Sequence, residues 1–595
     1  MTIHYTLCPS NPSAHIFSVS LYIEEPNPEG QIVSLPAWIP GSYMIREFSK
    51  NIVEMHAFVG EEEIPLFRID KHTWMFQSQG QPCTIRYTVY AWDLSVRMAH
   101  LDQTHGYCNG TSVFLEVQGQ SEQEHRVLVQ APTDPMCQNW KIATTLTACS
   151  ADPYTFGWFK AENYDELIDH PIEMGTFELL HFEACGVPHE VALTGVYKMD
   201  AQRLIQDLQK ICETEIQFFG EPAPMERYLF QVMVVGSGYG GLEHRASTSL
   251  ICNRDSLPAN DTDTTDEYQS FLGLCSHEYF HTWNVKRIKP AVFLPYDLTV
   301  ENYTSLLWVF EGWTSYYDDL ILRRAGLLST EKYLEILGKT ITSVYKGSGL
   351  HKQSLAESSF TAWTKYYRQD ENSPNAIVSY YTKGSLAALA LDLHVRMHST
   401  ISLDTVMKEL WIRFGSVGVG VPENGVEELV MELSGLDLRA WFDAVVRGTG
   451  ELPFSETFAH FGLELCKRYP ASSTDKGGGP KKTTPSPSLG VIYGSASFGV
   501  SIKSVHDNSP AQLVGLSAGD TIIAINGIQV TSGGIEKMLA RYGVGEEIQI
   551  HAFRRDELFV RNVVLVSEEE VAYYIVATDD NPEAVARRTA WLEGR

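Results

Sequence analysis

His277 and His281 frame an H-E-x-x-H motif, and this motif constrains the fold more than any other feature of the sequence. Residues 266–284 have the apolar spacing of a long helix, on which side chains at positions i and i+4 share one face. The two imidazoles can therefore converge on one ion, at about 2.0–2.1 Å each. Glu278 cannot easily reach the same coordination position, but its carboxylate can lie beside a water that the ion binds.

The motif alone is only moderately specific. The chain has 19 histidines, and the probability that such a chain contains H-E-x-x-H by chance is roughly one in twenty. A catalytic zinc needs a third protein ligand and keeps one position open. Glu311 lies in a second predicted helical stretch, 300–325, among aromatic residues such as Trp308 and Trp313. A carboxylate in such surroundings needs a partner, which a metal would supply; the alternative is a solvated helix face. Two histidines and a carboxylate suit zinc best, without excluding another divalent metal.

Composition and charge narrow the class of protein. The formal net charge is −28, which argues against nucleic acids or anionic membranes as partners, because both require clustered Lys and Arg. No signal peptide and no stretch long and apolar enough to span a membrane are visible. The ten cysteines are scattered without a C-x-x-C pair, as expected of reduced thiols. A cytoplasmic location is the expectation.

Changes in residue pattern along the chain predict a multidomain α+β protein. Residues 1–187 are rich in short alternating runs separated by turn signals, typical of an antiparallel β domain. Residues 188–469 begin with helix and strand patterns and become mostly helical. Residues 470–487 are rich in Pro, Gly, Ser, Thr and Lys and predict a flexible linker. Residues 488–567 form a compact β-rich module, and the tail 568–595 ends in a short predicted helix.

The residues around the motif carry a family resemblance. HEYFHTWNVKRIKP (277–290), followed by FEGWTSYYDDL (310–320), resembles the glycyl aminopeptidase family of zinc metallopeptidases, within the gluzincin group that includes aminopeptidase N. The resemblance implies a thermolysin-like, mostly helical catalytic domain with one zinc ion per chain on His277, His281 and Glu311. The gap between the two segments is longer than in aminopeptidase N, so residues 286–303 must loop out.

Two further matches bear on the reaction. Gly240-Gly241-Leu242-Glu243-His244 resembles the Gly-x-Met-Glu-Asn strand of aminopeptidase N, and this implies that Glu243 binds the free α-amine of a substrate. His244 stands where the group has Asn, and an ordinary exposed strand carboxylate is the alternative for Glu243. Ser379–Gly384 resembles the Tyr-x-Lys-Gly element of the same group. By this match Tyr381 stabilises the oxyanion, with adjacent Tyr380 as its rival, and Lys383 has a structural role.

Two other segments belong to the resemblance. The string LPAWIPGSYMIREFSK (35–50) has mixed apolar and charged character, and a structural role is favoured over a catalytic one. Residues 498–530 resemble a PDZ domain. Upstream of this segment, Leu489, Gly490 and Val491 could form the loop that holds a C-terminal carboxylate. The alternative is a PDZ domain that packs on the catalytic domain and binds no peptide.

The sequence therefore predicts an aminopeptidase that removes N-terminal residues from peptides, and the resemblance suggests a preference for small ones such as Gly or Ala. Glu278 would deprotonate the zinc-bound water and later protonate the leaving amine. One alternative is a zinc endopeptidase with the same ligands, in which Glu243→Ala would leave cleavage intact. The other is a PDZ adaptor with a vestigial metal site, which would show no bound zinc and no turnover.

Overall fold

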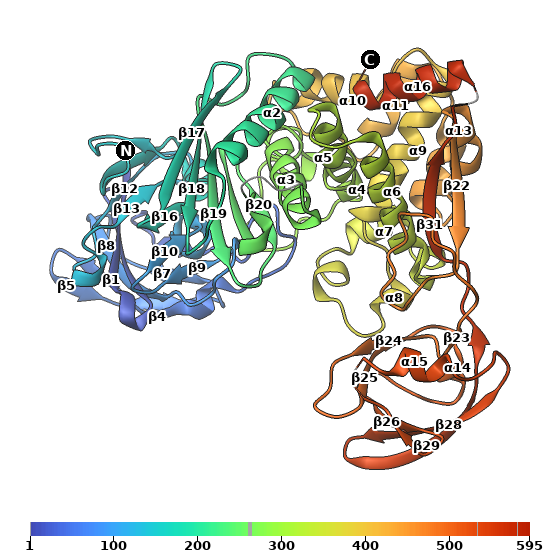
Figure 1. Cartoon of the computed structure of the whole chain (residues 1–595). Helices are drawn as coiled ribbons and strands as arrows, with labels where there is room; N and C mark the ends of the chain where they lie inside the picture. Colours follow the sequence, from blue (N-terminus) through green and yellow to red (C-terminus); the bar gives the residue numbers. More distant parts are fainter. Residues whose placement is uncertain (1, 260–263, 532, 580, 595) are drawn as a thin grey trace. The chain divides into compact units, whose positions relative to one another are not determined.

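A computed structural model describes residues 2–259, 264–531, 533–579 and 581–594 of the chain. The chain divides into two compact units. The first comprises residues 1–302 together with 408–421, and the second comprises residues 303–407 together with 422–595. The expected sequence of a β-rich region, a helical region and a PDZ-like β module is confirmed (Figure 1). No helix of the described residues combines the length and apolar character that crossing a membrane requires.

The N-terminal part of the first unit is built from β-sheets. Buried and half-buried residues alternate along its first strand, as expected of a strand with one face on a core. The largest sheet has the order β14 (Thr147–Ala148), β15 (Gly157–Ala161), β12 (Glu124–Val129), β1 (Thr2–Asn11), β2 (Ile16–Ile23), β8 (Cys83–Tyr90), β4 (Ile52–Val59) and β5 (Glu62–Ile64). Two smaller sheets have the orders β13 (Lys141–Ala143), β16 (Ile172–Gly175), β10 (His105–Cys108), β9 (Ala99–Leu101) and β11 (Glu116–Val117), β3 (Gln31–Ser34), β7 (Thr73–Phe76), β6 (Leu66–Arg68).

A mixed sheet in the same unit carries the segment with Glu243. Its order is β17 (Glu178–Ala184), β18 (Val187–Thr194), β19 (Tyr228–Val235), β21 (Ser247–Asn253) and β20 (Gly240–Glu243). The edge strand β20 pairs antiparallel with β21, and Glu243 lies opposite Thr248. Helix α2 (Ala201–Phe219) contacts β17, whereas α3 (Asp266–Phe280) contacts β20 and β21 (Figure 1). The helix with the H-E-x-x-H motif therefore lies directly beside the edge strand.

Local sequence explains why α3 begins and ends where it does. The Thr265 side chain caps the helix by accepting a hydrogen bond from the Tyr268 N–H, and two acidic residues in the first turn favour its N-terminus. Apolar and aromatic residues surround most of the helix, as expected when a helix is buried on several sides. The last residue of the motif, His281, is the residue that ends the helix.

The second unit is mostly helical outside its PDZ-like module. Its helices are α4 (Leu307–Phe310), α5 (Gly312–Arg324), α6 (Thr330–Tyr345), α7 (Leu355–Phe360), α8 (Ser373–Ala376), α9 (Thr382–His398), α11 (Gly425–Ser434), α12 (Arg439–Phe442), α13 (Phe454–His460) and α16 (Pro582–Glu593), while α10 (Leu403–Leu410) runs across the division. The sequence predicted one helix over residues 300–325. In the structure the helix starts at Leu307 and is interrupted at Glu311, which ends α4 and precedes α5.

The PDZ-like module is inserted into the helical region. Its sheet has the order β24 (Val491–Gly494), β25 (Val500–Val505), β26 (Thr521–Ile525), β28 (Glu547–Arg554) and β29 (Glu557–Val564), β27 (Ile528–Gln529) pairs with β26, and α14 (Pro510–Leu513) and α15 (Ile535–Leu539) complete it. Outside it, β22 (Leu463–Arg468) pairs with β31 (Ala572–Ala577), and β23 (Pro487–Ser488) pairs with β30 (Val566–Ser567). The chain therefore leaves and re-enters the helical region along paired strands.

The segments on either side of this module are anchored to the helices. Arg468 and Asp475 form a buried ion pair, 2.7 Å from Nη1 to Oδ2, and the Gly478 N–H donates to the Tyr573 carbonyl. These contacts tie Asp475 and Gly478, within the stretch 470–487 predicted as a linker, to neighbouring parts of the chain. The Trp591 indole N–H donates to the Tyr316 hydroxyl at 2.8 Å, so the C-terminal helix α16 packs on α5.

Candidate functional site

Two imidazoles lie together at the C-terminal end of α3. The ring centroids of His277 and His281 are 4.6 Å apart with planes at 88°. The His281 Nδ1 lies 2.6 Å from the Asn284 carbonyl oxygen, an acceptor that requires a proton on Nδ1. With Nδ1 protonated, Nε2 carries the ring lone pair that can bind a metal, and the carbonyl fixes the ring orientation. No sequence pattern indicated this carbonyl, which lies at the turn that follows the helix.

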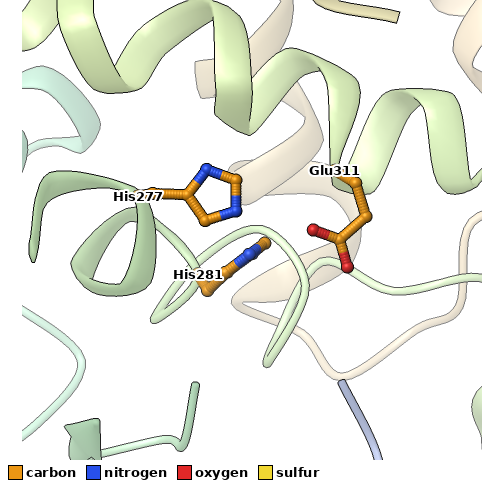
Figure 2. Close-up of side chains that lie close together, drawn as sticks. All are labelled: His277, His281 and Glu311. Carbon is orange, nitrogen blue, oxygen red and sulfur yellow. The ribbon is translucent and has the colours of Figure 1, made fainter. Parts of the chain in front are cut away.

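Glu311 supplies the third donor predicted from the sequence. Its side chain is almost completely buried, at 1% exposed. The donor atoms of His277, His281 and Glu311 all lie within 4.8 Å of one another, and Figure 2 shows the three side chains facing a common space. Two imidazole nitrogens and one carboxylate oxygen are the donor set of catalytic zinc sites that retain an open position. The residues present therefore fit a zinc ion, and the buried carboxylate fits the charge of a cation.

Two carboxylates lie beside one of these histidines. Oxygen atoms of Glu243 and Glu278 lie within 4.8 Å of each other and of a ring nitrogen of His281. Both side chains are nearly inaccessible to solvent, at 3% and 5% exposed. Two buried negative charges at this separation repel each other, and a nearby cation offsets the repulsion. This cluster of carboxylates is therefore suited to positive charge, either a metal ion or an ammonium group.

The edge strand approaches α3 so closely that only glycine fits. A Cβ added at Gly241 would overlap the Glu278 carboxylate. The Glu278 side chain therefore rests against bare backbone of β20, two residues before Glu243 in the same strand. Close approach of backbone to a functional group is a recurrent reason for glycine inside a strand. Gly241 of the sequence motif thus has a physical explanation in this contact.

A buried ion network fixes the chain just beyond β20. Asp169 accepts from Lys286 Nζ at 2.6 Å and lies 3.3 Å from His244 Nδ1, and the Arg245 backbone N–H donates to it at 3.1 Å. Against the opposing effect of burial, Lys286 and the neighbouring donors hold the pKa of Asp169 well below its usual range. His244 departs from the Asn of the related motif, and its contact with Asp169 anchors the end of the strand.

Tyr381 precedes the first turn of α9. Its ring stacks on Tyr380, with centroids 4.7 Å apart, and its hydroxyl lies 3.4 Å from the Tyr367 hydroxyl. Burial raises the pKa of Tyr381 well above its usual range, and the negative charge of Glu311 adds to the rise. The phenol therefore keeps its proton and can act as a hydrogen-bond donor.

Lys383, predicted to be structural, has an unusual environment. The residue is fully buried, at 0% exposed, and its Nζ makes no hydrogen bond within the described part of the chain. Burial lowers the pKa of Lys383 to about 8. Lys383 was predicted to have a structural role, but its Nζ has no hydrogen-bonding partner among the described residues. Its buried ammonium is therefore a cost to folding.

The predicted carboxylate loop of the PDZ-like module has the backbone shape of a tight turn. Gly490 has a positive φ of 69°, and a Cβ there would lie 2.4 Å from the Ser509 Cβ. The Gly490 N–H donates to the Ser488 hydroxyl at 3.0 Å, and Leu489 is completely buried. Val491 begins β24, the edge strand of the sheet in the described residues. An edge strand that follows such a loop offers backbone groups to an added strand.

One site contact was not anticipated from the sequence. A Cβ added at Gly41, which has a φ of 95°, would lie 2.5 Å from both carboxylate oxygens of Glu243. The string 35–50, for which a structural role was favoured, therefore reaches the carboxylate predicted to bind an amine. The Pro-Gly dipeptide indicated a turn, but no local pattern could reveal what the turn touches.

Comparison with known protein families agrees with these segments. Residues 4–176 match the Peptidase M61 N-terminal domain, residues 270–387 match the M61 glycyl aminopeptidase domain, and residues 501–539 match a PDZ domain. The second match spans the helix pair with the metal-ligand candidates and Tyr381. The resemblance inferred from the sequence motifs is thereby confirmed.

Solved structures extend the comparison to the whole chain. An aminopeptidase N family protein from Idiomarina loihiensis shares 41% sequence identity with a TM-score of 0.95, covering 99% of this chain and 100% of its own. The M1 zinc metallopeptidase from Deinococcus radiodurans shares 13% identity with a TM-score of 0.46, covering 76% of this chain and 94% of its own. Among curated proteins, none matches the chain.

Proposed function

Because the chain belongs to the glycyl aminopeptidase family and is a metallo-aminopeptidase, we propose that it holds one zinc ion on His277, His281 and Glu311. We further propose that it removes small N-terminal residues such as Gly or Ala from peptides. The observation that carries the proposal is the convergence of these three donors, with the carboxylates of Glu243 and Glu278 beside them. The preference for small residues rests on the family resemblance alone.

The donor set determines what chemistry a bound zinc would supply. When bound, zinc acts as a Lewis acid toward the scissile carbonyl and lowers the pKa of a coordinated water to about 7. His281 is held in the required orientation by the Asn284 carbonyl, and Glu311 brings a negative charge that favours a dication over a monocation. A buried, partly apolar surrounding strengthens each of these interactions.

Glu278 is proposed as the general base and acid. Its carboxylate lies beside His281 but is not one of the three proposed ligands, so it remains available to accept a proton from the attacking water. The same carboxyl group then donates that proton to the leaving amine. The backbone of Gly241 packs against Glu278, and this contact restricts the positions that the carboxylate can take.

Glu243 is proposed to bind the free α-amine of the substrate. The neighbouring carboxylates of Glu243 and Glu278 create a buried region of negative charge, which an ammonium group offsets. The position of Glu243 on an edge strand also lets the substrate backbone align with β20. A peptide with an acetylated N-terminus would lose the charge that this pocket requires.

Tyr381 is proposed to donate a hydrogen bond to the oxyanion. Its raised pKa keeps the phenol protonated, and the negative charge of Glu311 adds to that rise. For the PDZ domain, we propose that residues 489–491 and the edge of β24 bind the C-terminal end of a peptide. A cytoplasmic location stays a prediction from the sequence.

Hydrolysis of matched chromogenic amides tests the proposed function. Alanyl and glycyl p-nitroanilides would be compared with their N-acetylated forms, with and without a chelator. We expect cleavage of the free-amine substrates only, loss of cleavage with the chelator and recovery on adding Zn²⁺. Cleavage of both forms would replace the exopeptidase with an endopeptidase, and cleavage unaffected by the chelator would remove the metal from the reaction.

A further inference from the structure

The Pro40–Gly41 turn belongs to the β-rich N-terminal region, yet its backbone touches the Glu243 carboxylate. A Cβ at Gly41 would lie 2.5 Å from each of the two carboxylate oxygens. A side chain at position 41 would therefore occupy space that the carboxylate now fills. The positive φ of 95° separately favours glycine here, so the turn combines a special backbone shape with a close approach.

Hydrogen bonds and packing hold this turn in place. The Ser42 N–H donates to the Ile39 carbonyl at 3.0 Å, and an Arg46 Nη2 donates to the Ser42 hydroxyl at 2.6 Å. The Trp38 indole N–H donates to the Asp297 carbonyl at 2.9 Å, and the Ala37 N–H donates to Leu298. The segment is thus tied at both sides of Gly41.

The loop that follows the H-E-x-x-H helix provides the surface on which the turn rests. Tyr43 stacks on Phe293 with ring centroids 5.9 Å apart, and Trp38 meets Tyr296 edge to face at 5.7 Å. Trp38 and Tyr43 are fully buried. Burial raises the pKa of Tyr296 well above its usual range, with Glu243 among the carboxylates that add to the rise. The long connection 286–303 therefore has a role in supporting the turn.

A second contact from the N-terminal region reaches the same strand. The Arg97 Nη2 donates to the Gly241 carbonyl at 3.4 Å, two residues before Glu243. The N-terminal region therefore contacts β20 at a backbone carbonyl through Arg97 and at the Glu243 side chain through Gly41.

From these contacts we infer that Gly41 is a positioning residue for the amine pocket: the turn forms its back wall and sets where the Glu243 carboxylate lies. This inference rests on the proposed role of Glu243 in binding the substrate amine. The amine must then approach the carboxylate from the side away from Gly41. The backbone of Gly41 thereby makes the N-terminal region part of the proposed amine-binding site.

Gly41→Ala is the direct test, because the overlapping atoms are the end of a side chain. The fold can relieve the clash by rotating Glu243, so the carboxylate moves while the backbone stays. Gly119→Ala is the matched control: Gly119 has a φ of 82°, and a Cβ there meets nothing within 4 Å. Both variants carry the backbone strain of alanine at positive φ, and only the first displaces Glu243.

The measurements are the melting temperature and the values of KM and kcat for alanyl p-nitroanilide. We expect similar melting temperatures for the two variants, whereas Gly41→Ala alone raises KM by roughly tenfold to a hundredfold, the loss expected for a charge-assisted hydrogen bond. Adding Gly41→Ala to Glu243→Ala should change KM little further, since both changes remove one interaction. Unchanged KM in Gly41→Ala would overturn the inference.

The double variant also separates this inference from the proposed function. If Glu243→Ala raises KM and Gly41→Ala does not, the amine role of Glu243 stands and the positioning role of Gly41 fails. If Glu243→Ala leaves KM unchanged, the amine role fails and the inference fails with it. If the two effects multiply, Gly41 acts through another group, which also contradicts positioning through Glu243.

Discussion

Gly312 and Gly384 meet backbone to backbone where α5 passes α9. A Cβ added at Gly312 would lie 2.7 Å from the Gly384 Cα, and one added at Gly384 would lie 2.9 Å from the Gly312 Cα. The contact follows Glu311 directly on one side and lies in the first turn after Tyr381 on the other. The contact thereby holds the start of α5, which follows Glu311, next to the start of α9, which follows Tyr381.

Gly384→Ala should therefore disturb stability and turnover together. The new Cβ faces backbone atoms that cannot rotate away, and such overpacking costs about 1–3 kcal/mol of the free energy of unfolding. Separation of the helices should also lower kcat, because Glu311 and Tyr381 move apart. Denaturant unfolding and steady-state kinetics check both effects. Gly479→Ala, where the added Cβ meets nothing within 4 Å, should change neither; equal behaviour of the two variants would contradict the role of the crossing.

Glu278→Gln should abolish turnover while leaving the metal in place. The amide keeps the size of the side chain and its packing against Gly241, but it accepts no proton. A fall in kcat of about 10²–10⁴-fold is expected for loss of a general base. Zinc content measured on the same preparation should remain at the wild-type level. Loss of zinc in this variant would instead make Glu278 a ligand.

Tyr381→Phe should lower kcat by about 10²–10³-fold, the effect of removing one oxyanion donor. Tyr380→Phe is the comparison, because its hydroxyl is the rival for the same role and its ring stacks on Tyr381 at 4.7 Å. We expect this second variant to retain most of its kcat. The reverse order of the two effects would assign the donor to Tyr380.

Lys383→Met should stabilise the protein at neutral pH. The folded pKa is lowered to about 8 from an ordinary value of 10.5. Between these values the unfolded chain binds a proton that the folded chain lacks, so wild-type stability rises with pH across that window. Below pH 8 the full penalty applies, at most about 3 kcal/mol. Guanidinium unfolding at pH 7 and pH 10 should show a large gain that shrinks at the higher pH; a loss of stability at both would reveal a partner for Lys383.

Local sequence patterns predicted most of the residues of the proposed metal site. The H-E-x-x-H spacing placed His277 and His281 on one helical face, and the apolar neighbours of Glu311 indicated that its carboxylate needs a cation. The break of the helix at Glu311 was not predictable from the sequence pattern, and neither was the backbone contact of Gly312 with a distant helix. Periodicity reports which face is buried and contains no information about such a crossing.

Contacts between segments that are distant in the chain could not be predicted from local patterns either. The composition of residues 470–487 indicated a linker, and it contained no information about the ion pair of Arg468 with Asp475. The pairing of β22 with β31 makes the PDZ domain an insertion, although its own motifs were readable. The contact of Gly41 with Glu243 joins two regions whose local patterns indicate only a turn and a strand.

The amount of zinc bound per chain is the decisive measurement for the proposed metal centre. Wild-type protein, Glu311→Gln and the exposed control Glu464→Gln would be stripped with a chelator, reloaded with Zn²⁺, dialysed and analysed for metal. We predict one zinc per chain in the wild type and the control. Glu311→Gln should retain little zinc, because a neutral amide replaces the charged oxygen donor. One zinc per chain in Glu311→Gln, held as tightly as in the wild type, would contradict the proposed metal centre.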